Sequence, residues 1–591
     1  MFNVVHVTHE AVYKMGGIGT VLEGLINSRP YRDAVGRTLL VCPMFYPERL
    51  ERFGPGGAVE YSSLDHIHES PHADAFRQIE REWCVHFAYG QRPIEDEATA
   101  RRTMCEVLLV DLRWINRARV NDLKGLLWEY CGLQSNRHEH VWDFEQYVQI
   151  AGPAAAALEA LRIGGDAQPA IILAHEYMGL PTALAAALHQ PKHYRTLFHA
   201  HEVATMRRIV EEHPGHDVMF YNVLETARRS GLYLRDVFGP QDDYFKHAII
   251  ETSKYCDGTL AVGHHVVREL QFLGSDLEKS DITLAYNGIA SSRITPPRRA
   301  ESRQRLRDYC ASLLGWRPDH VFTHVTRLVR SKALWRDLQV LNHMDGEFGK
   351  RGQSVVLLVL STELPRRSID DVLRMEREWD WPLAHREIAP DLTPGEAAYY
   401  RWVQSFNARA RNIHVIYINQ FGFSPEACGS RVPAGVEFMD LRYGSDAEFG
   451  LSLYEPFGIS PLEPLSYGGV CVVSTSCGCA GAVKQLLNAE NARNIVLADY
   501  IHAEADRRPQ TVKQAIEIGE QERRAAEERA AEVVARELLR RLPTNEAEER
   551  ELLETGHALA EKLSWDAVAE RFILPAMRRA STRRLVYKLS G

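Results

Sequence analysis

The chain has 591 residues, of which 45% are hydrophobic and 25% are charged. This length exceeds what a single hydrophobic core usually supports, so we expect two or more domains. The net charge of −9 argues against a general nucleic-acid-binding protein, which would carry an excess of basic residues.

The first residues, MFNVVHVTHE, lack a basic segment followed by a long apolar run. We therefore interpret them as a first strand and not as a signal peptide. No uninterrupted apolar segment approaches the length that spans a membrane. The ten cysteines are scattered and form no pair of CxxC motifs at zinc spacing, which is typical of a reducing compartment. We expect a cytoplasmic protein with neither a membrane nor a nucleic acid as partner.

A glycine-rich loop follows the first strand, which we place at residues 2–7. The loop contains Lys14, Gly16 and Gly17 and leads into a helix that continues through residue 25. Glycines between a strand and a helix allow backbone N–H groups to approach an anion, and the helix N-terminus favours negative charge. The alternative is a tight turn in which Lys14 is simply exposed.

Two further strands end in clusters of polar residues. The apolar run 170–174 leads into His175 and Glu176, and the run 195–198 leads into His199, Ala200, His201 and Glu202. Open α/β sheets bind ligands at the carboxyl ends of their strands. We therefore expect His175 to contact the ligand, and His199 or His201 could reach the same place. The alternative for each histidine is a core residue, which we prefer for His199.

The rest of the N-terminal half predicts more alternating elements. We expect loops and a β-insertion over 61–100, a turn at Asn287-Gly288 and a linker at 295–303. The remaining strands are expected near 39–41, 106–112 and 258–262, and the helices at 151–161, 245–255 and 266–273.

In the C-terminal half, a strand at 321–325 precedes two cations, Arg327 and Lys332, and a helix over 333–341. Cations are unfavourable near a helix N-terminus, so their presence there indicates a nearby anion. Arg330 lies between them and ranks below the pair. A basic surface at the start of a helix is the alternative.

Two carboxylates, Glu455 and Glu463, stand eight positions apart before a buried strand at 470–474. If 460–468 is helical, Glu463 lies in its first turn, where the helix dipole tolerates an anion, and Glu455 stays in the preceding loop. The two carboxylates would then face one ligand from different levels. A small-residue loop, 475–481, follows the strand, as in half of a doubly wound nucleotide site. The alternative is a surface loop whose glutamates merely start a helix.

The other C-terminal segments are less informative. We expect strands at 354–360 and 414–417, a mostly helical segment at 364–411, a long solvent-facing helix at 511–541, a second helix ending near 562 and a last helix at 567–577. The segment 419–450 has no assignable role.

The motifs KMGG, HEY, NGI, R-x4-K and E-x7-E occur in this order along nearly the whole chain. In this respect the sequence resembles glycogen and starch synthases, which are retaining glycosyltransferases of the GT-B fold. That fold is α/β, with two Rossmann-like doubly wound domains facing each other across a cleft. The resemblance implies an acceptor-side domain at 1–295, a nucleotide-sugar-binding domain at 296–562 and a helix at 563–591 that crosses back to the first domain. Met178 stands where bacterial-type enzymes often have a histidine, so the pattern is nearer to the eukaryotic type.

The resemblance also implies a reaction and roles for residues. Glucose would pass from ADP-glucose or UDP-glucose to the non-reducing end of an α-1,4-glucan with retention, and the donor's phosphate would help to deprotonate the acceptor. Glu455 and His175 would hold the glucose, Glu463 the ribose, and Arg327 and Lys332 the diphosphate. The other expected donor contacts are Lys14, Gly16, Gly17, His201, Phe457, Gly458, Ile459, Ser460 and the Gly478–Gly481 amides.

No Asp-x-Asp motif is present, so we expect neither a metal nor a cofactor beside the donor. Three alternatives stay open: another donor or acceptor (sucrose-type, trehalose-type or a surface glycan), phosphorylase chemistry, and an inactive glucan-binding scaffold. Phosphorylase chemistry would need a pyridoxal-lysine motif that the sequence lacks. Whether the protein forms homo-oligomers is not predicted.

Overall fold

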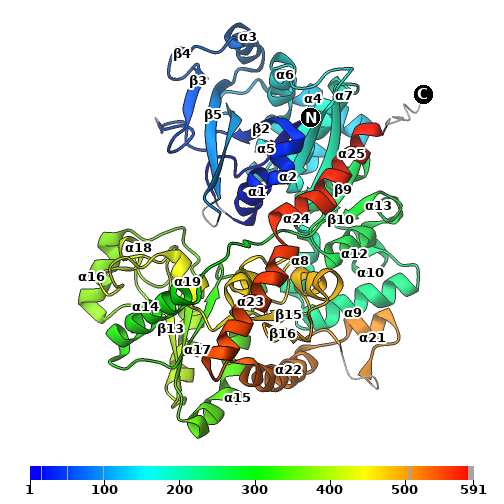
Figure 1. Ribbon diagram of the computed structural model, residues 1–591. Helices are drawn as coiled ribbons and strands as arrows, with labels where there is room; N and C mark the ends of the chain where they lie inside the picture. Colours follow the sequence, from blue (N-terminus) through cyan, green and yellow to red (C-terminus); the bar gives the residue numbers. More distant parts are fainter. Residues whose placement is uncertain (15, 50, 97–98, 503–506, 584–591) are drawn as a thin grey trace. The chain divides into compact units, whose positions relative to one another are not determined.

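The computed structural model describes residues 1–583 except 15, 50, 97–98 and 503–506 (Figure 1). It divides into two compact units. Unit 1 comprises residues 1–206, 227–288 and the segment from Trp565 onwards, and unit 2 comprises residues 207–226 and 289–564. The first sheet strand and the last helix of the chain thus belong to the same unit. Among the described residues, no helix combines the length and the apolar character needed to cross a bilayer.

Unit 1 is built on a ten-stranded sheet of order β10-β9-β8-β7-β1-β2-β6-β5-β3-β4. The strands from β10 to β6 pair in parallel, and β5, β3 and β4 add an antiparallel edge. The chain winds from β1 to β2 on one side and later returns to β7 on the other, so the strand order reverses between β1 and β7. The strands are β1 (Phe2–Val7), β2 (Val35–Pro43), β3 (Ala58–Ser62), β4 (Ile67–His68), β5 (His86–Asp96), β6 (Arg101–Asp111), β7 (Ala170–His175), β8 (Tyr194–Ala200), β9 (Gly258–Ala261) and β10 (Ile282–Leu284).

The helices of unit 1 connect these strands and cover the sheet, since almost every residue of β7 and β8 is buried. They are α1 (Gly17–Asn27), α2 (Arg29–Ala34), α3 (Ala73–Trp83), α4 (Arg117–Cys131), α5 (Trp142–Gln149), α6 (Ala151–Ala160), α7 (Glu176–His189), α10 (Leu234–Phe238), α11 (Phe245–Glu251), α12 (His264–Leu273), α13 (Ser275–Glu278), α24 (Trp565–Val568) and α25 (Leu574–Thr582). Helices α8 (Ala204–Glu212) and α9 (His216–Arg229) lie where the chain passes between the units.

Unit 2 has a six-stranded, wholly parallel sheet of order β13-β12-β11-β14-β15-β16. Its strand order reverses between β11 and β14, which makes this the doubly wound switch point. Alternate residues of β12 belong to two different hydrophobic clusters, Val355, Leu357 and Val359 to one and Val356, Leu358 and Leu360 to the other. Helices therefore cover both faces. The strands are β11 (His320–Val325), β12 (Val355–Leu360), β13 (Ile413–Ile418), β14 (Ala447–Gly450), β15 (Val470–Ser474) and β16 (Ile495–Ala498).

The helical elements of unit 2 are α14 (Pro296–Leu314), α15 (Trp335–Arg351), α16 (Ile369–Trp379), α17 (Pro394–Asn407), α18 (Pro425–Cys428), α19 (Phe438–Gly444), the 3₁₀ helix η4 (Ser460–Tyr467), α20 (Gly478–Ala482), α21 (Val512–Ile516), α22 (Glu520–Arg541) and α23 (Glu546–Lys562). Pro464 lies inside η4 and lacks the N–H that an α-helix would need there, which agrees with the 3₁₀ form of this helix.

The α/β class with two doubly wound units confirms the predicted fold, but several local predictions are wrong. The stretch 61–100 contains helix α3 as well as strands, and 295–303 is no linker but the start of α14. Thr295 caps that helix by accepting a hydrogen bond from the N–H of Arg298, and prolines occupy its first positions. The predicted helix 511–541 is two helices that break between residues 516 and 520. The unassigned segment 419–450 supplies β14, a central strand.

Candidate functional site

The sites expected in the two units both lie at the carboxyl ends of strands beside a switch point. In unit 1 the loop after β1 carries the glycines, His175 is the last residue of β7, and His201 directly follows β8. In unit 2 the loops after β11, β14 and β15 carry Arg327 and Lys332, Glu455, and Gly478 respectively. Both positions agree with the general location of ligand sites in open α/β sheets.

Lys332 and Glu455 meet in unit 2. The Lys332 ammonium donates a hydrogen bond to the Glu455 carboxylate, and the two side chains are 12% and 16% exposed. Lys332 belongs to a 3₁₀ turn, Arg330–Lys332, that precedes α15. The Ser331 carbonyl in this turn accepts hydrogen bonds from the N–H groups of Leu453 (2.7 Å) and Tyr454 (3.3 Å). Hydrogen bonds directly beside the ion pair therefore hold the loop after β11 and the loop after β14 together.

Arg327 and Arg330 differ from Lys332 in their surroundings. Arg327 is exposed, and its guanidinium has no hydrogen bond or ion pair with any residue that the structure describes. Arg330 is also exposed and lines a separate pocket together with Trp335 and Trp402. The structure thus brings only one of the two predicted cations, Lys332, against Glu455.

Glu463 is held by a residue that the sequence reasoning did not identify. Arg442, on α19, forms an ion pair with Glu463 (2.6 Å) and another with Glu448 of β14 (3.3 Å). Its guanidinium also donates to the Ser460 hydroxyl (2.9 Å), which itself donates to the carbonyl of Val325 at the end of β11 (2.8 Å). Burial opposes the charge of Arg442, but the two carboxylates outweigh it and raise its pKa.

Glu463 and Ser460 are thereby fixed in place by a buried cation from the segment 419–450. Glu463 keeps 24% of its side chain exposed, so the carboxylate still reaches the surface.

The glycine loop after β15 packs tightly against the Glu455 loop. The N–H of Gly478 donates to the Glu455 carbonyl (2.9 Å), and the N–H of Cys479 donates to the Phe457 carbonyl (2.8 Å). A side chain at Gly478 would collide with the Pro456 carbonyl oxygen, and Gly458 has φ +90°. These two glycines therefore shape the loop, and two of the amides expected to hold a diphosphate are already used within it. Phe457 is buried, and Ile459 is half-buried.

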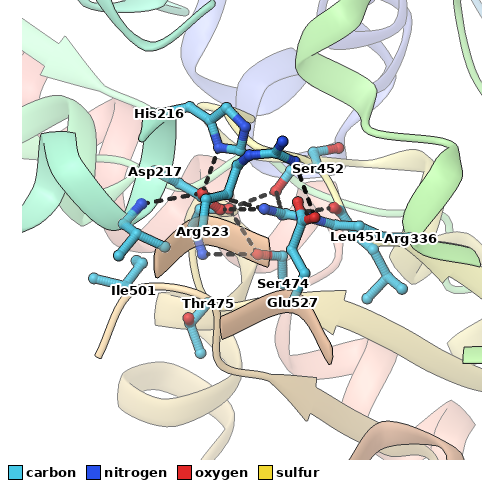
Figure 2. A network of polar contacts seen from close by, with 12 residues as sticks. His216, Asp217, Arg336, Leu451, Ser452, Ser474, Thr475, Ile501, Arg523 and Glu527 are labelled. Carbon is cyan, nitrogen blue, oxygen red and sulfur yellow. Dashed lines mark hydrogen bonds and ion pairs between the residues drawn. The ribbon is translucent and has the colours of Figure 1, made fainter. Parts of the chain in front are cut away.

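A buried ion network binds the residues that directly follow β14 and lead to Glu455 (Figure 2). Arg336 of α15 donates from Nη2 to both carboxylate oxygens of Asp217 (3.1 and 3.0 Å) and from Nε to Glu527 of α22 (2.9 Å). It also donates to the carbonyls of Leu451 (3.1 Å) and Ser452 (3.3 Å), which directly follow β14. All three charged side chains are buried, and Arg336 thus fixes the start of the segment that carries Glu455.

In unit 1, the glycine loop after β1 is organised by a buried carboxylate. Glu10 accepts hydrogen bonds from the N–H groups of Gly16 (2.9 Å) and Gly19 (3.0 Å). Lys14 is exposed and pairs with Glu23 of α1 (2.7 Å). The loop in this conformation directs two of its amides at its own carboxylate, and Gly17, at the start of α1, is exposed. The donor contacts expected of Lys14, Gly16 and Gly17 stay predictions.

His175 is the centre of a buried histidine cluster. Its Nε2 lies 2.9 Å from Nδ1 of His6, and its Nδ1 lies 2.9 Å from Nε2 of His201. The ring of His199 lies close to that of His201, with centroids 4.1 Å apart. Burial, aided by the neighbouring imidazoles, lowers the pKa of His175 and His201 well below the usual value, and burial lowers the pKa of His199 to about 3. The rings are therefore neutral near pH 7.

Glu176, the second residue of the HEY motif, connects the end of β7 to the residues that follow β8. It has φ +58°, an unusual backbone conformation for a glutamate, and its carboxylate accepts the N–H of Glu202 (2.5 Å). Burial and the nearby Glu202 raise its pKa well above the ordinary value. The motif thus positions His175 and the residues after β8 relative to one another.

No protein-family model matches the sequence, and no match was found among curated proteins. Solved structures nonetheless share its fold over almost the whole chain. The catalytic domain of starch synthase IV from Arabidopsis thaliana, bound to ADP and acarbose, is 15% identical, with a TM-score of 0.52, 98% of this chain covered and 100% of that one. Since the identity is low, this similarity establishes the two-domain GT-B fold and not the activity.

Two further structures give the same result. The N-terminal domain of trehalose-6-phosphate phosphatase from Candida albicans is 10% identical, with a TM-score of 0.51 and coverage of 98% and 96%. An α,α-trehalose-phosphate synthase (UDP-forming) from Burkholderia xenovorans, in complex with glucose-6-phosphate, is 12% identical, with a TM-score of 0.50 and coverage of 97% and 100%. The GT-B fold predicted from the motif order is confirmed.

Proposed function

We propose that this chain is a retaining glycosyltransferase that transfers glucose from ADP-glucose or UDP-glucose to the non-reducing end of an α-1,4-glucan. The observation that carries the proposal is the ion pair between Lys332 and Glu455 at the switch point of unit 2. In a sugar nucleotide, sugar hydroxyls lie next to a diphosphate. A carboxylate can accept hydrogen bonds from the hydroxyls, and a neighbouring ammonium can bind the diphosphate.

The charges of unit 2 suit the departure of a nucleoside diphosphate. Negative charge accumulates on the diphosphate as the bond to the sugar breaks, and a fixed ammonium stabilises that charge more in the transition state than in the ground state. Lys332 is held for this role by Glu455, and Arg327 has an exposed guanidinium that can turn towards a phosphate. Glu463, fixed by Arg442, is the proposed ribose contact. The roles of Lys14, His175 and His201 in unit 1 belong to the same proposal.

A trehalose-type reaction is the second candidate, because a trehalose-phosphate synthase shares the fold at nearly the same TM-score as the starch synthase. It would use the same donor half-site and a different acceptor, glucose 6-phosphate. The two candidates are separated by supplying each acceptor in turn with ADP-glucose or UDP-glucose and identifying the product. Label in a polymer supports the glucan acceptor, and label in a phosphorylated disaccharide supports the trehalose type.

A further inference from the structure

Three imidazoles converge in unit 1 at the carboxyl ends of two neighbouring strands. His175 ends β7 and pairs in register with His199 of β8, and His201 follows the end of β8 by one residue. One ring nitrogen from each of the three lies within 4.8 Å of the others. Nδ1 of His175 and Nε2 of His201 are 2.9 Å apart.

His199 has an unsatisfied side chain. It is 1% exposed, and neither of its ring nitrogens has a hydrogen-bond partner among the described residues. A neutral imidazole always carries one N–H donor and one lone pair, and buried polar groups of this kind are nearly always paired. A core histidine without a partner therefore points to a ligand at this place.

His175 is also held from the side that faces away from His201. Its Nε2 contacts Nδ1 of His6, whose Nε2 contacts the Tyr31 hydroxyl at 2.9 Å. Tyr31 in turn lies 3.2 Å from the Thr38 hydroxyl. This buried chain lets His175 donate its Nε2–H to His6 and leaves the lone pair of Nδ1 directed at the gap beside His201. Metal-bound histidines are commonly oriented by such a bond from the other ring nitrogen.

We propose that His175, His199 and His201 bind one divalent transition-metal ion of the zinc or cobalt type. Three imidazoles with no carboxylate favour such an ion over magnesium or calcium, which prefer oxygen ligands. Zinc–nitrogen bonds of 2.0–2.1 Å place tetrahedral ligands about 3.3 Å apart. A pair of ring nitrogens at the 4.8 Å limit must therefore close by up to about 1.5 Å, and the 2.9 Å pair of His175 and His201 must open by about 0.4 Å. The fourth position is left to a water molecule or another oxygen ligand.

This inference goes beyond the proposed glucosyl transfer, which needs no metal, and either can fail without the other. The metal would occupy Nδ1 of His175 and so withdraw that nitrogen from hydrogen bonding to a substrate. Whether the ion assists or inhibits transfer is a separate measurement from whether it binds.

Binding is tested on the full chain carrying a tag without histidines. The protein is stripped with EDTA, dialysed and titrated with Co²⁺, whose visible ligand-field spectrum reports the ligand set, and with Zn²⁺ in competition with a chromophoric chelator. We expect one equivalent of Co²⁺ per chain. Wild-type protein with native far-UV circular dichroism but no stoichiometric uptake overturns the proposal.

Variants then locate the ion. We expect His199→Gln and His201→Gln each to abolish stoichiometric uptake, and His6→Gln to weaken it about 10- to 100-fold. His557→Gln is the matched control, because His557 is also buried and also has a ring nitrogen without a partner among the described residues, but it lies on α23 in unit 2. Unchanged uptake in both ligand variants, or equal loss in the control, would show that the ion binds elsewhere. If one ligand variant does not fold, the other and the wild-type spectrum decide.

Discussion

Lys332 and Arg330 are two cations of the same 3₁₀ turn that the structure places in different surroundings. Lys332 is 12% exposed and paired with Glu455, whereas Arg330 is exposed and lines a pocket with Trp335 and Trp402. If Lys332 stabilises the departing diphosphate, its removal deletes one fixed charge from the transition state. Such contacts are typically worth about 2–4 kcal/mol, which corresponds to about a 30- to 1000-fold loss in kcat/KM.

The Lys332→Ala variant is therefore expected to lose donor turnover by that factor, and Arg330→Ala is expected to stay within about threefold of the wild type. The assay is release of the nucleoside diphosphate from ADP-glucose and UDP-glucose with glycogen as acceptor, over a range of donor concentrations. Removing Lys332 also leaves the Glu455 carboxylate without its cation, so thermal unfolding of each variant is measured alongside. Equal kinetic losses in two folded variants would refute the assignment of Lys332.

Three other changes test separate parts of the structure. We expect Glu455→Ala to lower turnover by orders of magnitude with little change in unfolding, measured by the same nucleotide-release assay. Arg336→Met removes the cation that the buried Asp217 and Glu527 share and leaves Asp217 with His216 and Glu527 with Arg523. Since a buried ion network then lacks its central charge, we expect a loss of about 3–5 kcal/mol in the free energy of unfolding by urea. Burial raises the pKa of Asp446, but Arg303, together with His320 and Arg299, outweighs burial and holds this pKa well below the usual range. Below about pH 4 the unfolded chain therefore takes up a proton at this position that the folded chain does not, and stability falls as the pH drops. Below about pH 4, we expect Asp446→Asn to reduce the slope of the free energy of unfolding against pH by up to about 1.4 kcal/mol per pH unit.

Each of these expectations has a contradicting result. A near-native rate in the Glu455→Ala variant would remove Glu455 from the reaction. A loss below about 1 kcal/mol for Arg336→Met would mean that Arg523, His216 or water compensates the charge of the two carboxylates. If the slope of the free energy of unfolding below about pH 4 is unchanged in Asp446→Asn, other carboxylates dominate acid unfolding.

The sequence was sufficient to predict the elements whose signal is local. Strands β1, β7, β11 and β15 are short, mostly apolar segments, and glycine, histidine or charged residues follow soon after each. Parallel strands that helices cover on both faces are mostly apolar, because the side chains on each face are buried. The order of the motifs then indicated two doubly wound domains.

The missed features depend on partners that are distant in sequence. Strand β14 has four residues and no apolar run, and only its neighbours β11 and β15 define it as central. Arg442 looks like an ordinary charged helix residue until the fold brings it to Glu463 and Ser460. Glu10 likewise acquires its role from the amides of a loop that closes over it. The start of α14 was missed for another reason, because prolines at the first positions of a helix were interpreted as a linker.

The measurement that tests the proposed function most directly is transfer of radiolabelled glucose from ADP-glucose and UDP-glucose, in parallel, onto glycogen. We predict incorporation into the polymer from one or both donors, and the more effective one identifies the nucleotide. The absence of both polymer label and nucleotide release, in protein shown to be folded, would contradict the glucosyltransferase proposal.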